Sequence, residues 1–506
     1  MDRVSEKQAK AEHRSKPTSE NFKKFIASGW APRDTTLPEL SEAAQAAVGR
    51  REAVSAAFPG ERLVIPAGGY KVRSNDCDYQ FRPHSAFAHL TGLGSDREPD
   101  AVLVLEPRTD DGESGHEAVL YFLPLADRDS EEFFADSRIG EFWVGTRPTL
   151  DSMAAELGVA TRPLEGLKDA IGKDAGLVRL RVVRDADVDV AAMVDQVRSE
   201  SGLIESQESR EAALELDTAL ARSLSTMRMI KDDWEIDQMR QACAATTTAF
   251  EAVAAEIPAA VARGRGERWI EGVFGLHARH TGNGVGYDSI CAAGDHANTL
   301  HWIKNTGDVR PGDLVLIDAG VEVDSLFTAD VTRTLPVDGR FTDVQRKVYD
   351  AVYAAQTAGI EACRPGNTFK DIHAAAIRVI AEHLFEWGLL PDGVDVETTL
   401  GEEGQWHRRW MVHGTSHHLG IDVHDCQLAL REDYMEGTLA PGMVLTVEPG
   451  LYFKADDELV PKEYRGIGVR IEDDILITAD GCENLSAALP RSSTEVETWL
   501  AQIQSR

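Results

Sequence analysis

The sequence lacks a paired cysteine motif, a long apolar run and any excess of basic residues. No CxxC pair occurs among its six cysteines, which argues against a zinc knuckle or a disulfide framework and fits a reducing compartment. No run of about eighteen apolar residues is present, which excludes an ordinary membrane span. The N-terminus, MDRVSEKQAKAEHRSK, is charged and has no apolar core, so no secretory signal is expected. We therefore expect a cytoplasmic protein.

The excess of acidic residues argues against nucleic acid and anionic membranes as binding partners. The chain has 53 basic and 85 acidic residues, a net charge of −32. Such a surface repels nucleic acid and anionic membranes, so we expect neither as a partner. The hydrophobic content of 42% and charged content of 27% are typical of a soluble globular protein.

At 506 residues the chain is too long for one ordinary hydrophobic core. Residues 1–54 are polar and predict an extension that contains one loosely defined helix over 37–52. Short apolar runs at 63–65 and 101–105, mixed with helical patterns, predict an α/β domain over 55–205. A second domain over 206–506 includes an amphipathic helix, one face of which is spaced by three and four residues, at Ile236, Met239, Cys243, Thr246, Phe250 and Val253.

The second domain contains an internal repeat. Residues 309–320 and 439–450 each have a Pro-Gly turn, an apolar run of β-forming residues, an acid seven positions after the proline, and a glycine. The repeat places Asp318 and Glu448 at equivalent positions. Two related halves would then face each other, each supplying a carboxylate at the end of a buried strand.

Two further acids lie beside apolar segments. A strand through 328–334 would place Asp330, Thr332 and Thr334 on one face, where Thr332 could hydrogen-bond a metal-bound carboxylate. A strand through 469–477 would project Arg470 and Glu472 the same way. A lone acid at such a place usually caps a turn, and an Arg–Glu pair usually forms a structural salt bridge. Several acids of this kind together favour metal binding, because carboxylates beside buried strands are costly without a cation.

Histidines add to this pattern. His413, His417, His418 and His424 lie within twelve positions, and His301 stands apart upstream. A lone histidine is usually a core or surface group, and spacing does not assign individual roles. Four carboxylates with one imidazole (Asp318, Asp330, His417, Glu448 and Glu472) would balance two divalent cations. An oxygen-rich set favours Mn²⁺, with Co²⁺ and Zn²⁺ as alternatives, and two such ions activate a water for hydrolysis.

The motifs in this arrangement resemble the Xaa-Pro aminopeptidases (aminopeptidase P) of the pita-bread metallopeptidases, family M24. The resemblance rests on LVLIDAG (314–320), ADVTRT (329–334), HGTSHHLGIDVHD (413–425), GMVLTVEPGLY (442–452) and YRGIGVRIEDDI (464–475). It covers roughly residues 55–490. It implies an N-terminal creatinase-like α/β domain and a C-terminal α+β pita-bread domain with internal pseudo-twofold symmetry.

The resemblance also implies roles for individual residues. The ligands of two metal ions would be Asp318, Asp330, His417, Glu448 and Glu472, with Asp330 and Glu472 bridging the ions. His301, His413, His424 and Arg470 would act in catalysis, and Tyr287 would contact substrate. The substrates would be peptides with proline at position two, and the protein would form a dimer or tetramer.

Three alternatives remain open on the sequence. Prolidase, which is restricted to dipeptides, uses the same five ligands, so the ligands cannot separate the two activities. Methionine aminopeptidase shares the ligand types but lacks the R-x-E-D-D pattern at 470–474. A metal-free binding module of the same fold would have lost ligand carboxylates, and this chain keeps all of them.

Overall fold

The computed structural model describes residues 17, 19–108 and 115–505, which form two compact units. One unit ends at Ala221 and the other begins at Arg222, within helix α10 (Gln207–Met227). The domain boundaries expected at residues 55 and 206 stay predictions. The charged segment 1–16, on which the expectation of no secretory signal rests, lies outside the described residues.

The first unit is built on a five-stranded mixed sheet with the order β6-β5-β4-β1-β7. The central strands β1 and β4 pair antiparallel, while β7 runs parallel to β1. The strands are β1 (Glu61–Pro66), β4 (Val102–Pro107), β5 (His116–Phe122), β6 (Ala160–Pro163) and β7 (Arg179–Val182). The apolar runs at 63–65 and 101–105 thus contribute to neighbouring strands, as expected, and their side chains are buried because helices cover the sheet.

The helices of the first unit are short. The longer ones are α3 (Glu42–Ala57), α7 (Leu150–Leu157) and α9 (Val188–Glu200). The helix expected loosely over 37–52 is α3, and it begins later because the Ser41 side chain accepts a hydrogen bond from the Ala44 N–H and caps the helix there. Smaller elements are α2 (Glu20–Ile26), α4 (Ser85–Thr91), α5 (Glu132–Ala135), α6 (Glu141–Val144), α8 (Leu167–Gly172), η1 (Leu164–Gly166), β2 (Val72–Ser74) and β3 (Cys77–Asp78).

The second unit contains two three-stranded antiparallel sheets. The first sheet has the order β12-β10-β9 and the second has the order β13-β16-β17. The strands are β9 (Ile290–Ala293), β10 (Leu314–Ala319), β12 (Val331–Pro336), β13 (Val444–Val447), β16 (Asp473–Ile477) and β17 (Cys482–Asn484). The two Pro-Gly repeats lead into β10 and β13, the central strand of one sheet and an edge strand of the other. Each repeat thus ends in a strand with an acid at its end, Asp318 in β10 and Glu448 directly after β13.

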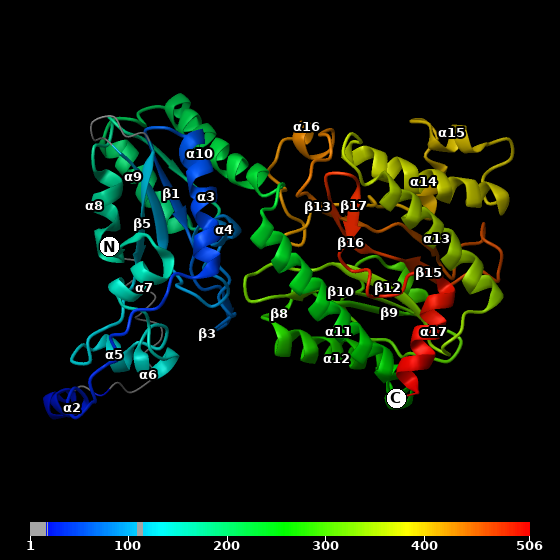
Figure 1. Ribbon diagram of the computed structural model, residues 1–506, viewed down its shortest axis with the longest axis horizontal. Coiled ribbons are helices and arrows are strands. Elements are labelled where there is room, and N and C mark those ends of the chain that lie inside the picture. Colours follow the sequence, from blue (N-terminus) through cyan, green and yellow to red (C-terminus); the bar gives the residue numbers. More distant parts are fainter. Residues whose placement is uncertain (1–16, 18, 109–114, 506) are drawn as a thin grey trace. The chain divides into compact units, whose positions relative to one another are not determined.

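Long helices cover these sheets (Figure 1). Helices α11 (Asp233–Arg263) and α12 (Gly266–Thr281) pack against each other on one side, and α13 (Asp343–Ala362) and α14 (Phe369–Glu386) form a second pair. The amphipathic helix predicted through 236–253 is confirmed as the first part of α11, where Met239, Cys243 and Phe250 are buried. One hydrophobic core joins α11, α12, β10, α13 and α14. It holds the strands that carry the acidic residues.

The remaining elements of the second unit are short, apart from the C-terminal helix α17 (Ser493–Gln504). Strands β14 (Gly450–Phe453) and β15 (Ile467–Arg470) form a hairpin pair, and β8 (Gly284–Val285) pairs with β11 (Val321–Glu322). The others are η2 (Gly294–Asn298), α15 (Val396–Leu400), η3 (Trp406–Arg409) and α16 (Arg431–Tyr434). Among the described residues, no helix is both long enough and apolar enough to cross a membrane.

Candidate metal centre

A cavity of about 550 Å³ in the second unit gathers the site residues expected from the sequence. All ten line it, although they come from widely separated parts of the chain. They are Tyr287, His301, Asp318, Asp330, His413, His417, His424, Glu448, Arg470 and Glu472.

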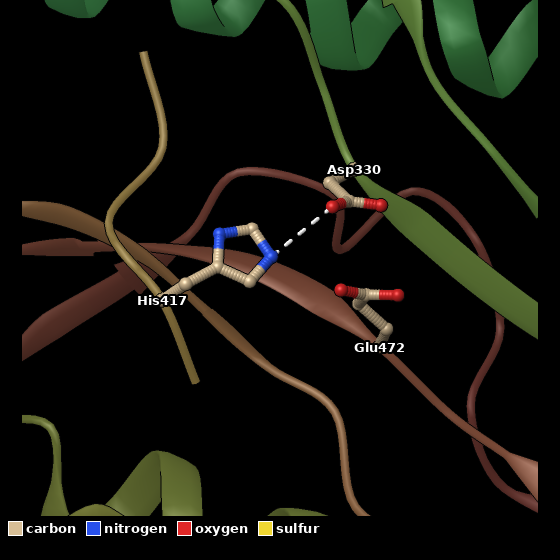
Figure 2. A group of neighbouring side chains, drawn as sticks. All are labelled: Asp330, His417 and Glu472. Atoms are coloured by element: carbon tan, nitrogen blue, oxygen red, sulfur yellow. Dashed lines mark ion pairs between the residues drawn. The ribbon is translucent and has the colours of Figure 1, made fainter. Parts of the chain in front are cut away.

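Asp330, His417 and Glu472 lie close enough together in the cavity to hold one metal ion (Figure 2). One potential ligand atom from each residue lies within 4.8 Å of those from the other two, and His417 Nε2 is 3.3 Å from Asp330 Oδ2. Asp330 immediately precedes β12, and Glu472 lies between β15 and β16. Side chains from distant parts of the chain thus converge, and their imidazole and carboxylate atoms are suitable ligands for a divalent cation.

Asp318, the last but one residue of β10, lies beside this group. Its Oδ1 is 2.7 Å from the Tyr287 hydroxyl, which also hydrogen-bonds Asp330. Burial, followed by the charges of Asp318 and Asp330, raises the pKa of Tyr287 well above its usual value. The phenol therefore keeps its proton and connects the two carboxylates as a donor.

Glu448 and His417 are held together by the backbone. The Glu448 N–H donates to the Thr415 carbonyl at 2.8 Å, and the His417 N–H donates to Thr446 Oγ1 at 3.1 Å. The segment carrying His417 therefore runs beside β13, at whose end Glu448 lies. His417 Nδ1 is 3.1 Å from the His418 carbonyl oxygen and Nε2 faces Asp330 and Glu448, so a neutral, metal-binding ring would carry its proton on Nδ1.

The pKa shifts of this group indicate that negative charge is concentrated in the cavity. Burial and neighbouring carboxylates raise the pKa of Glu472, and burial raises the pKa of Asp318 despite the Arg470 cation. Burial also raises the pKa of Glu448 to about 7, against the effect of His417. Burial alone would lower the pKa of His417, but Asp330 and Glu448 outweigh it and raise the value to about 9. Divalent cations would remove this repulsion, so the donor set fits them.

The outer histidines have a different electrostatic environment. Burial, with Arg470 next, lowers the pKa of His413 to about 3, and burial with His417 lowers the pKa of His424. His413 Nε2 lies 2.7 Å from the Tyr452 hydroxyl. His301 lines the cavity from the segment after η2. At neutral pH His413 and His424 are neutral rings that can donate or accept a hydrogen bond.

Arg470 departs from the sequence-based expectation. Its guanidinium pairs with Asp318 at 2.5 Å, so the expected alternative of a salt bridge with Glu472 is not the pairing observed. The strand expected through 469–477 is also interrupted, because β15 ends at Arg470 and β16 begins at Asp473. The Glu472 N–H donates instead to the Thr332 carbonyl at 3.1 Å. This break turns the Glu472 side chain into the cavity.

The sequence predicted only some of the hydrogen bonds around the carboxylates of the cavity. Thr332 does bond a carboxylate of the set, since its hydroxyl lies 2.6 Å from Glu472 Oε2. Two roles were missed: Asp474 accepts the Asp330 N–H at 3.1 Å, and Tyr452 joins His413 to Arg470. The acids after Glu472 and the tyrosine after Glu448 are visible in the sequence, but their partners are remote in the chain.

Comparison with known proteins identifies similar sequences. The profile of Metallopeptidase family M24 matches residues 237–479, and the profile of the Aminopeptidase P N-terminal domain matches residues 47–177. The chain is 50% identical to Xaa-Pro aminopeptidase 1 of Streptomyces coelicolor, over 96% of this chain and 93% of that protein. It is 34% identical to the Xaa-Pro aminopeptidase of Escherichia coli, over 89% of this chain and 96% of that protein.

Solved structures of aminopeptidases P share the fold of this chain. Aminopeptidase P of Escherichia coli with the inhibitor Pro-Leu matches with a TM-score of 0.77 and 31% identity, covering 93% of this chain and all of that one. Aminopeptidase PepP of Pseudomonas aeruginosa matches with a TM-score of 0.76 and 29% identity, over 93% of this chain and 100% of that one. The expected order of an α/β domain followed by a pita-bread domain is confirmed.

Proposed function

The chain belongs to metallopeptidase family M24, and from this premise we propose that it is an Xaa-Pro aminopeptidase, which removes the N-terminal residue from peptides whose second residue is proline. The observation that carries the proposal is the cavity lined by the ten residues. Relatives at 50% and 34% identity over nearly the whole chain are named for the same activity.

Asp318, Asp330, His417, Glu448 and Glu472 would hold two divalent metal ions. When bound, such ions supply Lewis-acid chemistry that activates a water for attack on the peptide carbonyl near neutral pH. We propose Mn²⁺ as the native metal because the donors are mainly carboxylate oxygens, with Co²⁺ and Zn²⁺ as alternatives. The raised pKa values of Glu448 and Glu472 support a bound cation of some kind, since a positive charge would favour the charged carboxylates.

The surrounding residues would orient the ligands and the peptide. The Tyr287 hydroxyl lies within hydrogen-bond distance of Asp318 and Asp330, and the Arg470 guanidinium pairs with Asp318 Oδ2. These contacts support a positioning role for Tyr287 in addition to the substrate contact expected from the sequence. The two groups fix the Asp318 carboxylate in one orientation, which a metal ligand needs.

The neutral histidines suit a proline substrate. Proline in a peptide has no N–H, so the enzyme must recognise the substrate through other groups and must protonate an imino leaving nitrogen. His301, His413 and His424 line the cavity and could hydrogen-bond the peptide or move a proton to that nitrogen. The Escherichia coli relative has been solved with the inhibitor Pro-Leu, which supports recognition of proline in this fold.

We propose a cytoplasmic location and a dimeric or tetrameric assembly. All six cysteines are free thiols, and Cys243, Cys291, Cys363 and Cys426 are buried, which supports a reducing compartment. The assembly rests on the resemblance to the family. Sedimentation of the purified protein measures it, and a single monomeric species at micromolar concentration would contradict it.

A panel of peptides tests the activity. The protein loaded with Mn²⁺, Co²⁺ or Zn²⁺ is given Arg-Pro-Pro, Arg-Pro and Arg-Ala-Pro, and released arginine is measured. We expect cleavage of Arg-Pro-Pro, none of Arg-Ala-Pro, and loss of activity after EDTA. Cleavage of Arg-Pro alone would instead identify a prolidase, and full activity after exhaustive chelation would contradict the metal mechanism.

A further inference from the structure

One wall of the cavity is a segment without helix or strand. Residues 299–304 contribute Leu300, His301 and Ile303 to the lining, and Ile303 is 46% exposed. A segment of this kind has no ladder of backbone hydrogen bonds to hold it. Its position must therefore be fixed by other groups.

The carboxylate of Glu267 is the main anchor behind this segment. Glu267 lies in the first turn of α12 and is fully buried. Its Oε1 accepts the Ala293 N–H at 2.9 Å and lies 2.7 Å from His296 Nδ1. Its Oε2 accepts the Trp302 Nε1–H at 2.9 Å and the Gly307 N–H at 2.5 Å. One side chain thus joins the residues before the wall, within it and after it.

The packing around Glu267 leaves little freedom. The rings of His296 and Trp302 stack with centroids 3.9 Å apart, so the indole between His301 and Ile303 is held on the side of Glu267. A Cβ at Gly307 would lie 2.7 Å from Glu267 Oε1, which explains the glycine. The fully buried Asn305 adds a second anchor, because its side chain bonds the Cys291 N–H and the Ser289 carbonyl, each at 2.9 Å.

We propose that Glu267 is a positioning residue of the peptidase reaction, which sets the place of His301 and Ile303 in the cavity. The proposal rests on the proposed function. Burial of a carboxylate is costly unless donors satisfy it, and four donors converge on this one. None of its contacts is with Asp318, Asp330, His417, Glu448 or Glu472. Its loss should therefore disturb peptide binding and turnover while metal binding is retained.

The variant Glu267→Gln tests this role. It keeps the size of the side chain but turns an NH₂ group toward two of the four donors. We expect kcat/KM for Arg-Pro-Pro to fall at least tenfold, with metal content equal to that of the wild type. Amide hydrogen exchange in residues 294–307 should become faster. A change in kcat/KM of less than twofold, or loss of the metal, would overturn the proposal.

A double-mutant cycle with His301→Ala separates positioning from general destabilisation. If Glu267 acts through the wall, Glu267→Gln should lower kcat/KM less than threefold in the His301→Ala background, far less than in the wild type. Equal losses in both backgrounds would mean that Glu267 acts elsewhere. The matched control is Glu256→Gln, which replaces the charged acceptor of another Glu–Trp hydrogen bond, that of Trp269 at 2.9 Å, by a neutral amide away from the wall. It should leave kcat/KM unchanged.

A milder variant covers the case in which Glu267→Gln does not fold. Trp302→Phe removes one donor to Glu267 and keeps an aromatic ring against His296. It should lower kcat/KM about threefold to tenfold and make exchange in 294–307 faster, and no change in either would contradict the proposal. If the wild type cleaves no Xaa-Pro peptide, the proposed function fails, while the exchange rates still report whether Glu267 anchors the wall.

Discussion

At the scale of single residues, the cavity depends on carboxylates whose charges repel one another. Glu448 is the clearest case, because burial raises its pKa to about 7 although His417 is 3.6 Å away. Its negative charge is costly to bury, and a bound divalent cation would favour it more strongly than the His417 ring does. Loss of that charge should therefore affect function much more than stability.

We predict that Glu448→Gln reduces bound metal and lowers kcat at least a hundredfold, while the fold is retained. The amide is a poor metal ligand, and the rest of the packing is unchanged. Metal content by atomic emission, circular dichroism and kinetics on Arg-Pro-Pro measure the three effects. Glu436→Gln, at an exposed ion pair with Lys370, is the control. Normal turnover by Glu448→Gln would exclude it as a ligand.

His373, outside the metal centre, gives a prediction about pH. Burial, with Arg408 and His407 next, lowers its pKa to about 4 from the ordinary 6.5. Between these values the unfolded chain binds a proton that the folded protein does not, so stability falls as the pH drops through this range. Above about pH 6.5 the ring is neutral in both states and contributes no pH dependence.

We predict that His373→Gln removes this part of the pH dependence. Between pH 7.5 and pH 5, the free energy of unfolding of the wild type should fall by about 1 kcal/mol more than that of the variant. This value is reduced for the partial exposure of the ring. Urea unfolding at both pH values measures it. His280→Gln, at an exposed position, should show no such difference. A pH-independent effect of His373→Gln would mean that the ring is not held neutral.

At the scale of elements, the acids are placed by strand ends and close backbone contacts. β10 ends at Ala319, and the next residue, Gly320, passes so near the chain before β12 that a Cβ there would lie 1.6 Å from the Ala329 carbonyl oxygen. This approach brings Asp318 and Asp330 to the same side of the cavity. A side chain at Gly320 would force the two segments apart.

We predict that Gly320→Ala costs about 2 kcal/mol or more in stability and also lowers the metal content. The control is Gly272→Ala in α12, where no heavy atom lies within 4 Å of an added Cβ. That variant should be neutral or gain up to about 1 kcal/mol, because alanine favours a helix over glycine. Thermal unfolding and metal analysis distinguish the two variants. Equal stability of both would show that β10 and β12 can separate without cost.

The elements also show what sequence reasoning can and cannot provide. The Pro-Gly repeats predict β10 and β13 with an acid at each end, because strand signals and turn residues are local. The break between β15 and β16 was not predicted, since it depends on a bond from the Glu472 N–H to the remote Thr332 carbonyl. The pairing of Arg470 with Asp318 likewise joins residues 152 positions apart. Local patterns hold no information about such partners.

At the scale of the whole molecule, the predicted ligands all lie in the unit that begins at Arg222. A cation that binds only the folded form of this unit stabilises it, by about 2.7 kcal/mol at a hundredfold excess over Kd. The first unit holds none of these ligands. Metal removal should therefore act on one part of the chain.

We predict that EDTA speeds amide hydrogen exchange in β10, β13 and residues 415–419, with little change in the sheet of the first unit. Exchange measured by mass spectrometry with and without Mn²⁺ compares the two units in one sample. The Glu448→Gln variant serves as the control, because its exchange rates should change little when EDTA or Mn²⁺ is added. An equal response in both units, or none in the second, would contradict a metal centre at this place.

The internal repeat predicted within the second unit would have a consequence for assembly. Asp318 and Asp330 belong to one half, while His417, Glu448 and Glu472 belong to the other. A polypeptide carrying a single half would need a second molecule to complete the pocket, so its activity would depend on dilution. With both halves in one chain, that encounter is an intramolecular step with a high effective concentration. Of the five proposed ligands, the only imidazole, that of His417, lies in the later half.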